Sequence, residues 1–183
     1  EGDIVFASLT NRGKRYAYWR MLQEDGSENY FDANGQSVQR LLMKTPVDGA
    51  RLSSRFGMRR HPILGFTRLH RGLDFAAPVG TPIYAAGDGQ VTKIGRYGDN
   101  GLYIKLRHSS GFQTAYAHMN GFAKGLQKGD RVKQGQIIGY VGRTGLATGP
   151  HLHYEVLQSN KPVNPRSLDL PPRQELNAQQ MAA

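Results

Sequence analysis

The residues after about position 46 form a series of short, strand-like segments separated by turns rich in glycine. Residues 81–86, 90–94 and 102–106 are rich in β-branched and aromatic side chains, and glycine-containing turns at 87–89 and 99–101 separate them. The 23 glycines and 9 prolines of the chain fit many turns and argue against long helices. Short strands at this frequency predict an all-β fold, a small antiparallel sheet or sandwich with a groove.

Two changes in composition divide the chain. Residues 1–45 contain an aromatic run at 15–22, turn signals at 24–27 and 34–35, and a return strand at 28–32, which predict a short β-rich N-terminal segment. The sequence Thr-Pro-Val-Asp-Gly at 45–49 indicates a boundary, so we expect the main domain to span 46–168. Residues 169–183 are polar, and we expect a frayed tail from about Pro171 onward.

Charge and cysteine content exclude several classes of protein. The formal net charge of +10 attracts polyanions, and both nucleic acid and the acidic bacterial wall qualify. The basic residues are scattered and no nucleic-acid fold signature is present, which argues against nucleic acid. The absence of cysteine excludes disulfides and thiolate metal sites. No apolar run is long enough for a membrane span, and the abrupt Glu1-Gly2-Asp3 start suggests a piece of a longer protein.

Two short motifs carry side chains of the metal-ligating type. His70 and Asp74 are four residues apart, a spacing that brings both to one side of a helix or a strand. His151 and His153 alternate around a leucine and therefore share one face of a strand. Two imidazoles and a carboxylate suit zinc with one coordination position left open for water. The spacing leaves open which histidine of the second motif is the ligand.

The remaining histidines differ in the patterns around them. In the strand-like stretch 112–118, alternation places Thr114, Tyr116 and His118 on one face, so His118 should point with Tyr116. His61 precedes a proline in an expected loop, and His108 opens a turn at 108–111. We interpret these last two as structural residues, because a lone histidine is more often a surface or core residue than a ligand.

Five short motifs follow one another along the chain: Arg-Phe-Gly at 55–57, Arg-His-Pro-Ile at 60–63, His-Arg-Gly-Leu-Asp at 70–74, Tyr-Ala-His at 116–118 and Gly-Pro-His-Leu-His-Tyr-Glu at 149–155. In this order they resemble the lysostaphin/LytM-type zinc endopeptidases, which cut the peptide part of bacterial peptidoglycan. The resemblance covers about residues 46–168. The resemblance implies that His70, Asp74 and His153 hold Zn²⁺, while His118 and His151 stay off the metal and serve catalysis.

Peptide hydrolysis also needs a base and a proton donor. No glutamate lies in a His-Glu-x-x-His arrangement, so imidazole has to replace it. We predict His151 as the base and His118 as the group that stabilises the oxyanion or donates a proton. Glu155 shares the face of His151 and His153 by alternation. It either orients one of them or forms a salt bridge at the strand end.

Residues 1–45 resemble the stretch that precedes the peptidase domain in Gram-negative, envelope-anchored members of this family. That resemblance implies an exported, periplasmic protein that acts on direct D-alanyl–diaminopimelate crosslinks, with upstream wall-binding or regulatory domains in a longer precursor. The alternative is a non-catalytic module that binds the wall or activates an amidase. Residues 128–142 also resemble biotinyl and lipoyl carrier domains, but no methionine-flanked lysine stands at a hairpin tip. The five intact site positions favour the enzyme.

Overall fold

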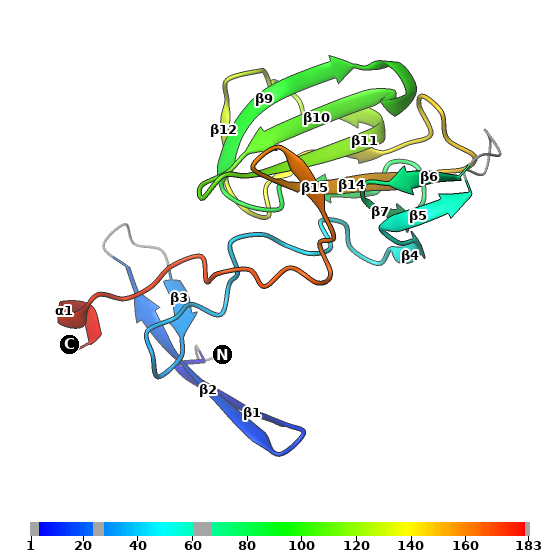
Figure 1. The fold of residues 1–183 in the computed structure, drawn as a ribbon. Helices are drawn as coiled ribbons and strands as arrows, with labels where there is room; N and C mark the ends of the chain where they lie inside the picture. Colours follow the sequence, from blue (N-terminus) through cyan, green and yellow to red (C-terminus); the bar gives the residue numbers. More distant parts are fainter. Residues whose placement is uncertain (1–3, 24–27, 61–66, 182–183) are drawn as a thin grey trace. The chain divides into compact units, whose positions relative to one another are not determined.

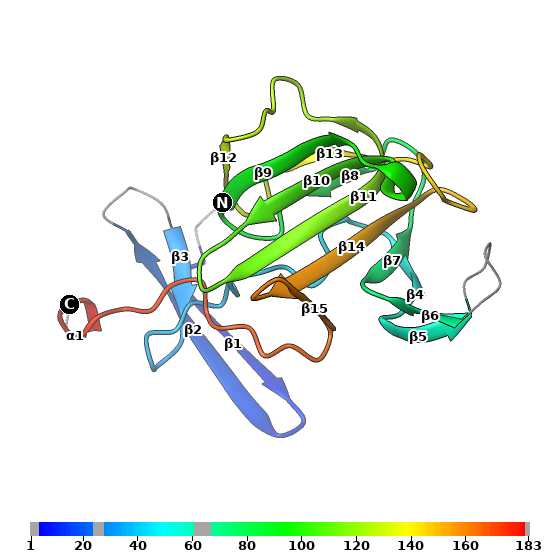
Figure 2. The same cartoon turned by 45° about the horizontal axis from the view of Figure 1, so that its top comes forward.

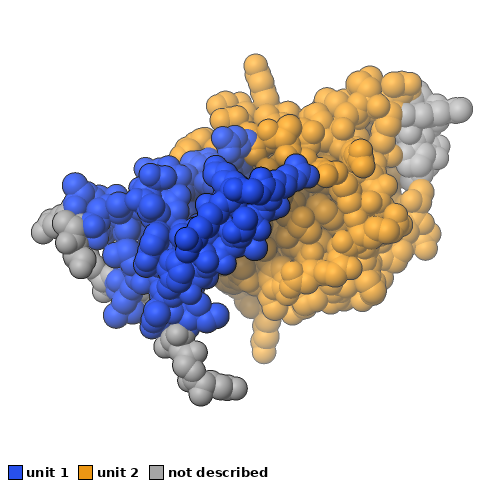
Figure 3. Space-filling model, turned by 90° about the horizontal axis from the view of Figure 1, so that it is seen from below, with its two compact units in different colours: residues 1–42, 169–183 blue, residues 43–168 orange. Residues whose placement is uncertain are grey.

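The computed structural model describes residues 4–23, 28–60 and 67–181. The turn expected at 24–27 and the loop residue His61 lie outside these ranges. The chain divides into two compact units, residues 43–168 and residues 1–42 together with 169–183, which Figure 3 colours separately. The domain limits expected from the sequence stay predictions.

The larger unit is built on a ten-stranded sheet whose main path runs β12-β9-β10-β11-β14-β7-β4 (Figure 1). Strand β13 pairs with β11 and β8, β15 pairs with β14, and β5 and β6 form a separate hairpin. The strands are β4 Arg51–Ser54, β5 Gly57–Arg60, β6 Thr67–His70, β7 Leu73–Ala76, β8 Pro82–Tyr84, β9 Gly89–Arg96, β10 Leu102–Arg107, β11 Phe112–Phe122, β12 Arg131–Val132, β13 Ile137–Val141, β14 His151–Gln158 and β15 Lys161–Val163.

All strand pairs of the described residues are antiparallel, and the helical elements among these residues are short: η1 Gly98–Asn100 and α1 Ala178–Met181. The all-β, antiparallel prediction is confirmed. No helix in the described part of the chain is long and apolar enough to cross a membrane. Figure 2 looks onto strands β9, β10, β11 and β14, which run side by side.

Alternation along β14 separates the core from the site. Leu152 and Tyr154 are completely buried, and burial of a large apolar side chain contributes roughly 1.5–3 kcal/mol to folding. His151, His153 and Glu155 alternate with them and are only partly buried on the opposite face, as the sequence predicts. One strand therefore anchors itself in the core and presents three polar side chains on its other face.

Strand β11 breaks its alternation at His118, whose φ of 59° lies in the left-handed region. Opposite β10, the pairing passes from Tyr116 to Met119 while the partner strand advances only from Ile104 to Leu102. The extra residue on β11 makes a β-bulge, which re-aims the side chain at that point.

The predicted direction of His118 is therefore wrong. Tyr116 pairs with Tyr154 on the core face, whereas Ala117 pairs with His153 on the site face. Strict alternation would send His118 to the core with Tyr116. Because of the bulge, its ring instead lies 4.7 Å from the ring of His151 and 6.0 Å from that of His153, centroid to centroid.

The smaller unit contains a three-stranded sheet in the order β1-β2-β3, with bounds Phe6–Asn11, Lys14–Leu22 and Glu28–Phe31. The fraying expected from about Pro171 onward is not observed at residues 171–176, which pair with residues 35–41. The backbone N–H groups of Ser37, Leu41, Arg173 and Leu176 donate to carbonyls across two segments, 35–41 and 171–176. Composition could not reveal this pairing, because the hydrogen bonds join residues that are 130 or more positions apart.

Candidate metal and catalytic centre

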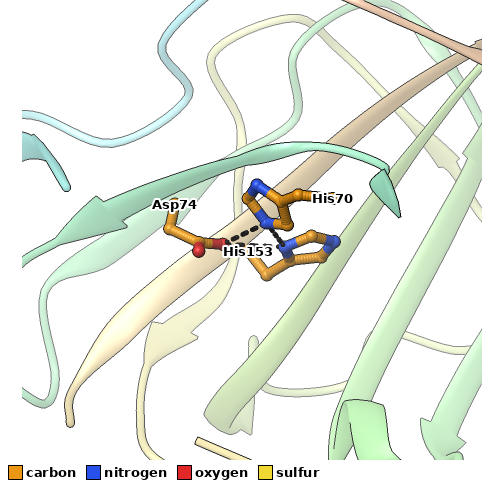
Figure 4. Close-up of side chains that lie close together, drawn as sticks. All are labelled: His70, Asp74 and His153. Carbon is orange, nitrogen blue, oxygen red and sulfur yellow. Dashed lines mark hydrogen bonds and ion pairs between the residues drawn. The ribbon is translucent and has the colours of Figure 1, made fainter. Parts of the chain in front are cut away.

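Three side chains from three strands converge on one point, as Figure 4 shows. His70 ends β6, Asp74 lies in β7, and His153 lies in β14 directly opposite Asp74 in the register. Asp74 Oδ1 is 3.0 Å from His70 Nε2 and 2.8 Å from His153 Nδ1, and the two ring nitrogens lie 3.1 Å apart. The backbone between His70 and Asp74 passes close to β14 at Gly72, where a Cβ would lie 2.3 Å from the Tyr154 carbonyl oxygen. A residue without a side chain is therefore needed at this position.

The outward-facing nitrogen of each ring is held by a second partner. His70 Nδ1 lies 2.8 Å from the Arg55 carbonyl oxygen, to which it donates. His153 Nε2 lies 3.0 Å from Glu155 Oε1 and donates to that carboxylate. When both rings are neutral, as ligating imidazoles must be, these protons leave His70 Nε2 and His153 Nδ1 with lone pairs that face Asp74. Such outer partners fix the tautomer and orientation of metal-ligating histidines.

The donor set fits a metal cation. The three ligand atoms of His70, Asp74 and His153 lie within 4.8 Å of one another. Two ring lone pairs and a carboxylate oxygen at this separation repel one another unless a cation or a proton lies between them. Two imidazole nitrogens and one carboxylate oxygen are ligands that zinc accepts in open, three-ligand sites.

Electrostatics keep the carboxylate ionised. In the metal-free chain, burial by itself would raise the pKa of Asp74, but hydrogen bonds with the rings of His153 and His70 outweigh it and hold that pKa far below its usual value. The other oxygen, Oδ2, lies 3.2 Å from Arg59 Nη2. Burial by itself would lower the pKa of His153, but its bonds to Asp74 and Glu155 raise that pKa to about 9 when no metal is bound.

His118 and His151 lie beside this cluster, and the Nδ1 atom of each ring is hydrogen-bonded to a backbone carbonyl. His118 Nδ1 is 2.8 Å from the Thr144 carbonyl oxygen, and His151 Nδ1 is 2.8 Å from that of Gly149. Both Nε2 atoms are therefore left as proton acceptors, and that of His151 lies 3.8 Å from Asp74 Oδ1. Burial lowers the pKa of His118 to about 4, with further lowering by His151 and His153, so the ring is neutral at pH 7.

Thr144 holds the bulge that carries His118. Its hydroxyl accepts from the Leu102 N–H at 2.9 Å and donates to the Met119 carbonyl at 2.6 Å. The backbone approaches so closely that a Cβ on Gly101 would lie 2.4 Å from Thr144. Thr144 and Arg59 were both missed in the sequence. Neither belongs to a ligand-type pattern, and only the fold brings them to the site.

All five residues singled out in the sequence line one groove of about 400 Å³. They are His70, Asp74, His118, His151 and His153. Glu155 also lies there, and its contact with His153 favours the orienting role over a plain salt bridge at the strand end.

His108 is bound into a structural network, which supports the interpretation from the sequence. It is buried, with Nδ1 at 2.8 Å from the Asp88 carbonyl and Nε2 at 2.7 Å from Thr114 Oγ1. Thr114 Oγ1 in turn contacts the Tyr116 hydroxyl, which accepts from the Ala86 N–H. Both ring nitrogens of His108 are thus used within the core.

Comparison with known proteins gives this geometry a context. The family model described as Peptidase family M23 matches residues 68–165, more than half of the chain. "Peptidoglycan DD-endopeptidase ShyC" of Vibrio cholerae is 44% identical over 176 residues, which are 96% of this chain and 40% of that protein. "DD-carboxypeptidase/endopeptidase Mpg" of Neisseria meningitidis is 42% identical over 189 residues, with 93% and 40% covered. The chain thus spans about two fifths of these curated relatives.

Solved structures of peptidases have a similar fold. A zinc-containing peptidase from Vibrio cholerae superposes with a TM-score of 0.67 at 37% identity, over 92% of this chain and 51% of that one. The catalytic domain of lysostaphin from Staphylococcus simulans gives 0.58 at 30% identity, over 65% and 91%. The family model, the relatives and the all-β fold lead to one conclusion: the chain belongs to peptidase family M23.

Proposed function

We propose that this chain is the catalytic part of a zinc-dependent endopeptidase that hydrolyses peptide crosslinks of bacterial peptidoglycan. The observation that carries the proposal is the convergence of His70, Asp74 and His153 beside two further histidines with free Nε2 atoms. The expected target is the D-alanyl–diaminopimelate bond, which the names of the relatives support because they describe peptidoglycan DD-endopeptidases. Residues 46–168 would form the peptidase domain.

In this proposal His70 Nε2, Asp74 Oδ1 and His153 Nδ1 hold the zinc. Bound zinc in such an open site lowers the pKa of a water molecule towards about 7 and polarises the substrate carbonyl. Arg59 keeps Asp74 Oδ2 engaged, so that the carboxylate offers one oxygen to the metal. Glu155 holds the Nε2–H of His153 and keeps the ligating nitrogen pointed inward.

His151 and His118 move the protons. His151 Nε2 lies 3.8 Å from the ligand oxygen Asp74 Oδ1. Because of this position beside the metal ligands, we assign His151 as the base that takes the proton of the attacking water. His118 is a neutral ring whose Nε2 carries no proton, so it can protonate the leaving amine only with the proton that His151 has taken from the water. Their rings are 4.7 Å apart, which suits two groups that act on one scissile bond.

The alternative, a non-catalytic wall-binding or amidase-activating module, is less well supported. A module that needs no chemistry has no use for three convergent ligand atoms and two oriented histidines, and all five are present here. From a substrate in the wall we infer that the protein is exported and acts in the cell envelope, in the periplasm. Because the match covers only 40% of each of these relatives, we expect the whole protein to carry further, upstream domains.

One digestion tests the proposal. Purified crosslinked muropeptide dimers are incubated with the chain, with and without a chelator, and the products are identified by mass. We expect dimers to become monomers with new amines and intact glycan, and the chelator to stop the reaction. Release of reducing sugar ends without new amines would contradict the proposal, as would full activity in the presence of chelator.

A further inference from the structure

The hairpin of β5 and β6 places two arginines side by side on the wall of the groove. Arg59 and Arg68 are direct partners in the antiparallel register, so their side chains leave the same face of the hairpin. His70, the next residue on that face of β6, points into the metal centre. Arg59, Arg68 and His70 all line the groove.

Like charges directly opposite each other destabilise a strand pair. The charge of Arg59 is balanced by Asp74, whose Oδ2 lies 3.2 Å away. Arg68 is exposed and makes no side-chain hydrogen bond or ion pair with any residue that the structure describes. The segment 61–66 between the two strands contains no acidic residue in the sequence. No acidic side chain of the hairpin therefore offsets the repulsion between Arg59 and Arg68.

Three carboxylates line the groove; Asp74 and Glu155 are already engaged, and the third, Asp99, forms no ion pair with Arg68 in the part of the chain that the structure describes. Asp74 receives His70, His153 and Arg59, and Glu155 lies 3.0 Å from His153 Nε2. A guanidinium that lines a substrate groove without a partner is suited to a ligand carboxylate, because its donors match the two oxygens in a fork. A peptide bond alone offers no charge that would select an arginine at this place.

We propose that Arg68 binds a free carboxylate of the substrate peptide and so helps to select the bond that is cut. This inference rests on the proposed function. Two free carboxylates next to the crosslink have the required chemistry. One is the C-terminal carboxylate of D-alanine, and the other is the free carboxylate of the diamino acid beside the crosslink.

The test measures binding and turnover separately. Binding of an uncrosslinked tetrapeptide, which carries both carboxylates and has no crosslink to cut, is measured by calorimetry with zinc present. Three proteins are compared: the unmodified chain, Arg68→Gln, and Arg131→Gln, an exposed arginine of β12 that does not line the groove. The peptide is supplied unmodified, as the C-terminal amide, and with the diamino acid carboxylate amidated.

We expect Arg68→Gln to weaken binding about three- to tenfold, the range for a partly exposed charge-assisted contact, and Arg131→Gln to leave it unchanged. Amidation of the carboxylate that Arg68 holds should weaken binding to the unmodified chain by the same factor as the Arg68→Gln substitution does. The same amidation should not weaken binding to the Arg68→Gln variant any further. Which of the two amides behaves in this way identifies the carboxylate. With the crosslinked dimer, KM should rise by a similar factor while kcat stays the same.

Two failures are distinguishable. Carboxylate-dependent binding that requires Arg68 in a chain that cuts no dimer would overturn the proposed function alone. Three results would overturn the role of Arg68. The first is equal binding of the tetrapeptide by Arg68→Gln and the unmodified chain, and the second is no binding by the unmodified chain. The third is that each amide weakens binding to Arg68→Gln as much as it weakens binding to the unmodified chain.

Discussion

Replacing Glu155 by glutamine should change the pH dependence of zinc binding, not only its strength. Glu155 Oε1 lies 3.0 Å from His153 Nε2. Burial opposes the charged ring, but contacts with Asp74 and Glu155 raise the pKa of His153 to about 9 without metal. A ligating imidazole must be neutral, so below this pKa a proton competes with the metal for His153.

The magnitude follows from that pKa. Each pH unit below about 9 costs tenfold in apparent zinc affinity, so affinity at pH 7 should be about 100-fold weaker than above the pKa. Glu155→Gln has two opposing effects. It removes a carboxylate that supports the ligand, which typically costs about 10–100-fold in metal affinity. It also lowers the pKa of His153 and so weakens proton competition. The loss should be largest near pH 9.5 and smaller at pH 7.

The assay is competition with a zinc-binding dye at several pH values, for the unmodified chain, for Glu155→Gln, and for Glu175→Gln as a control in the other unit. We expect a slope of about one decade per pH unit for the unmodified chain and the control, and a shallower slope for Glu155→Gln. Zinc affinity that does not vary between pH 7 and 9, or an equal loss for Glu155→Gln at both, would refute the reasoning.

Three further perturbations have separate readouts. Thr144→Val removes the hydrogen bonds of the hydroxyl to the Leu102 N–H and the Met119 carbonyl, so the free energy of unfolding in urea should fall by about 1–3 kcal/mol. Turnover should fall as well while zinc is retained, and Thr144→Ser should keep both the stability and the turnover. His108→Leu should cost a similar roughly 1–3 kcal/mol without changing zinc content, and loss of zinc would contradict a purely structural role. The ring of His118 in the metal-free chain should titrate near pH 4 by NMR, with the proton on Nδ1 at neutral pH, and a midpoint near 6.5 would contradict its burial.

Local periodicity predicted which side chains of β14 share a face, whereas the choice of ligands and catalytic histidines came from the family resemblance. Alternation alone puts His151, His153 and Glu155 on one face of β14, and the structure has them there. It could not distinguish the two histidines, since that depends on the register with β7. The register sets His153 opposite Asp74, with Nδ1 2.8 Å from its Oδ1, while Nε2 of His151 is 3.8 Å away.

Long-range pairing accounts for what the sequence did not predict. The direction of His118 depends on a bulge that exists only because β11 pairs out of step with β10. Arg59 reaches Asp74 because β5 folds back along β6, and nothing in its local pattern indicates that contact. In each case the deciding partner lies on another strand, beyond the reach of helical or strand periodicity.

The most direct test of the central claim separates the two histidines of β14. Bound zinc per chain is measured after dialysis for His151→Ala and His153→Ala, together with turnover of a muropeptide dimer. His153→Ala should lose both zinc and activity. His151→Ala should keep its zinc through His70, Asp74 and His153 and still lose about 10²–10⁴-fold in turnover. If His151→Ala loses its zinc while His153→Ala retains it, the assignment of ligand and base is reversed and the account is contradicted.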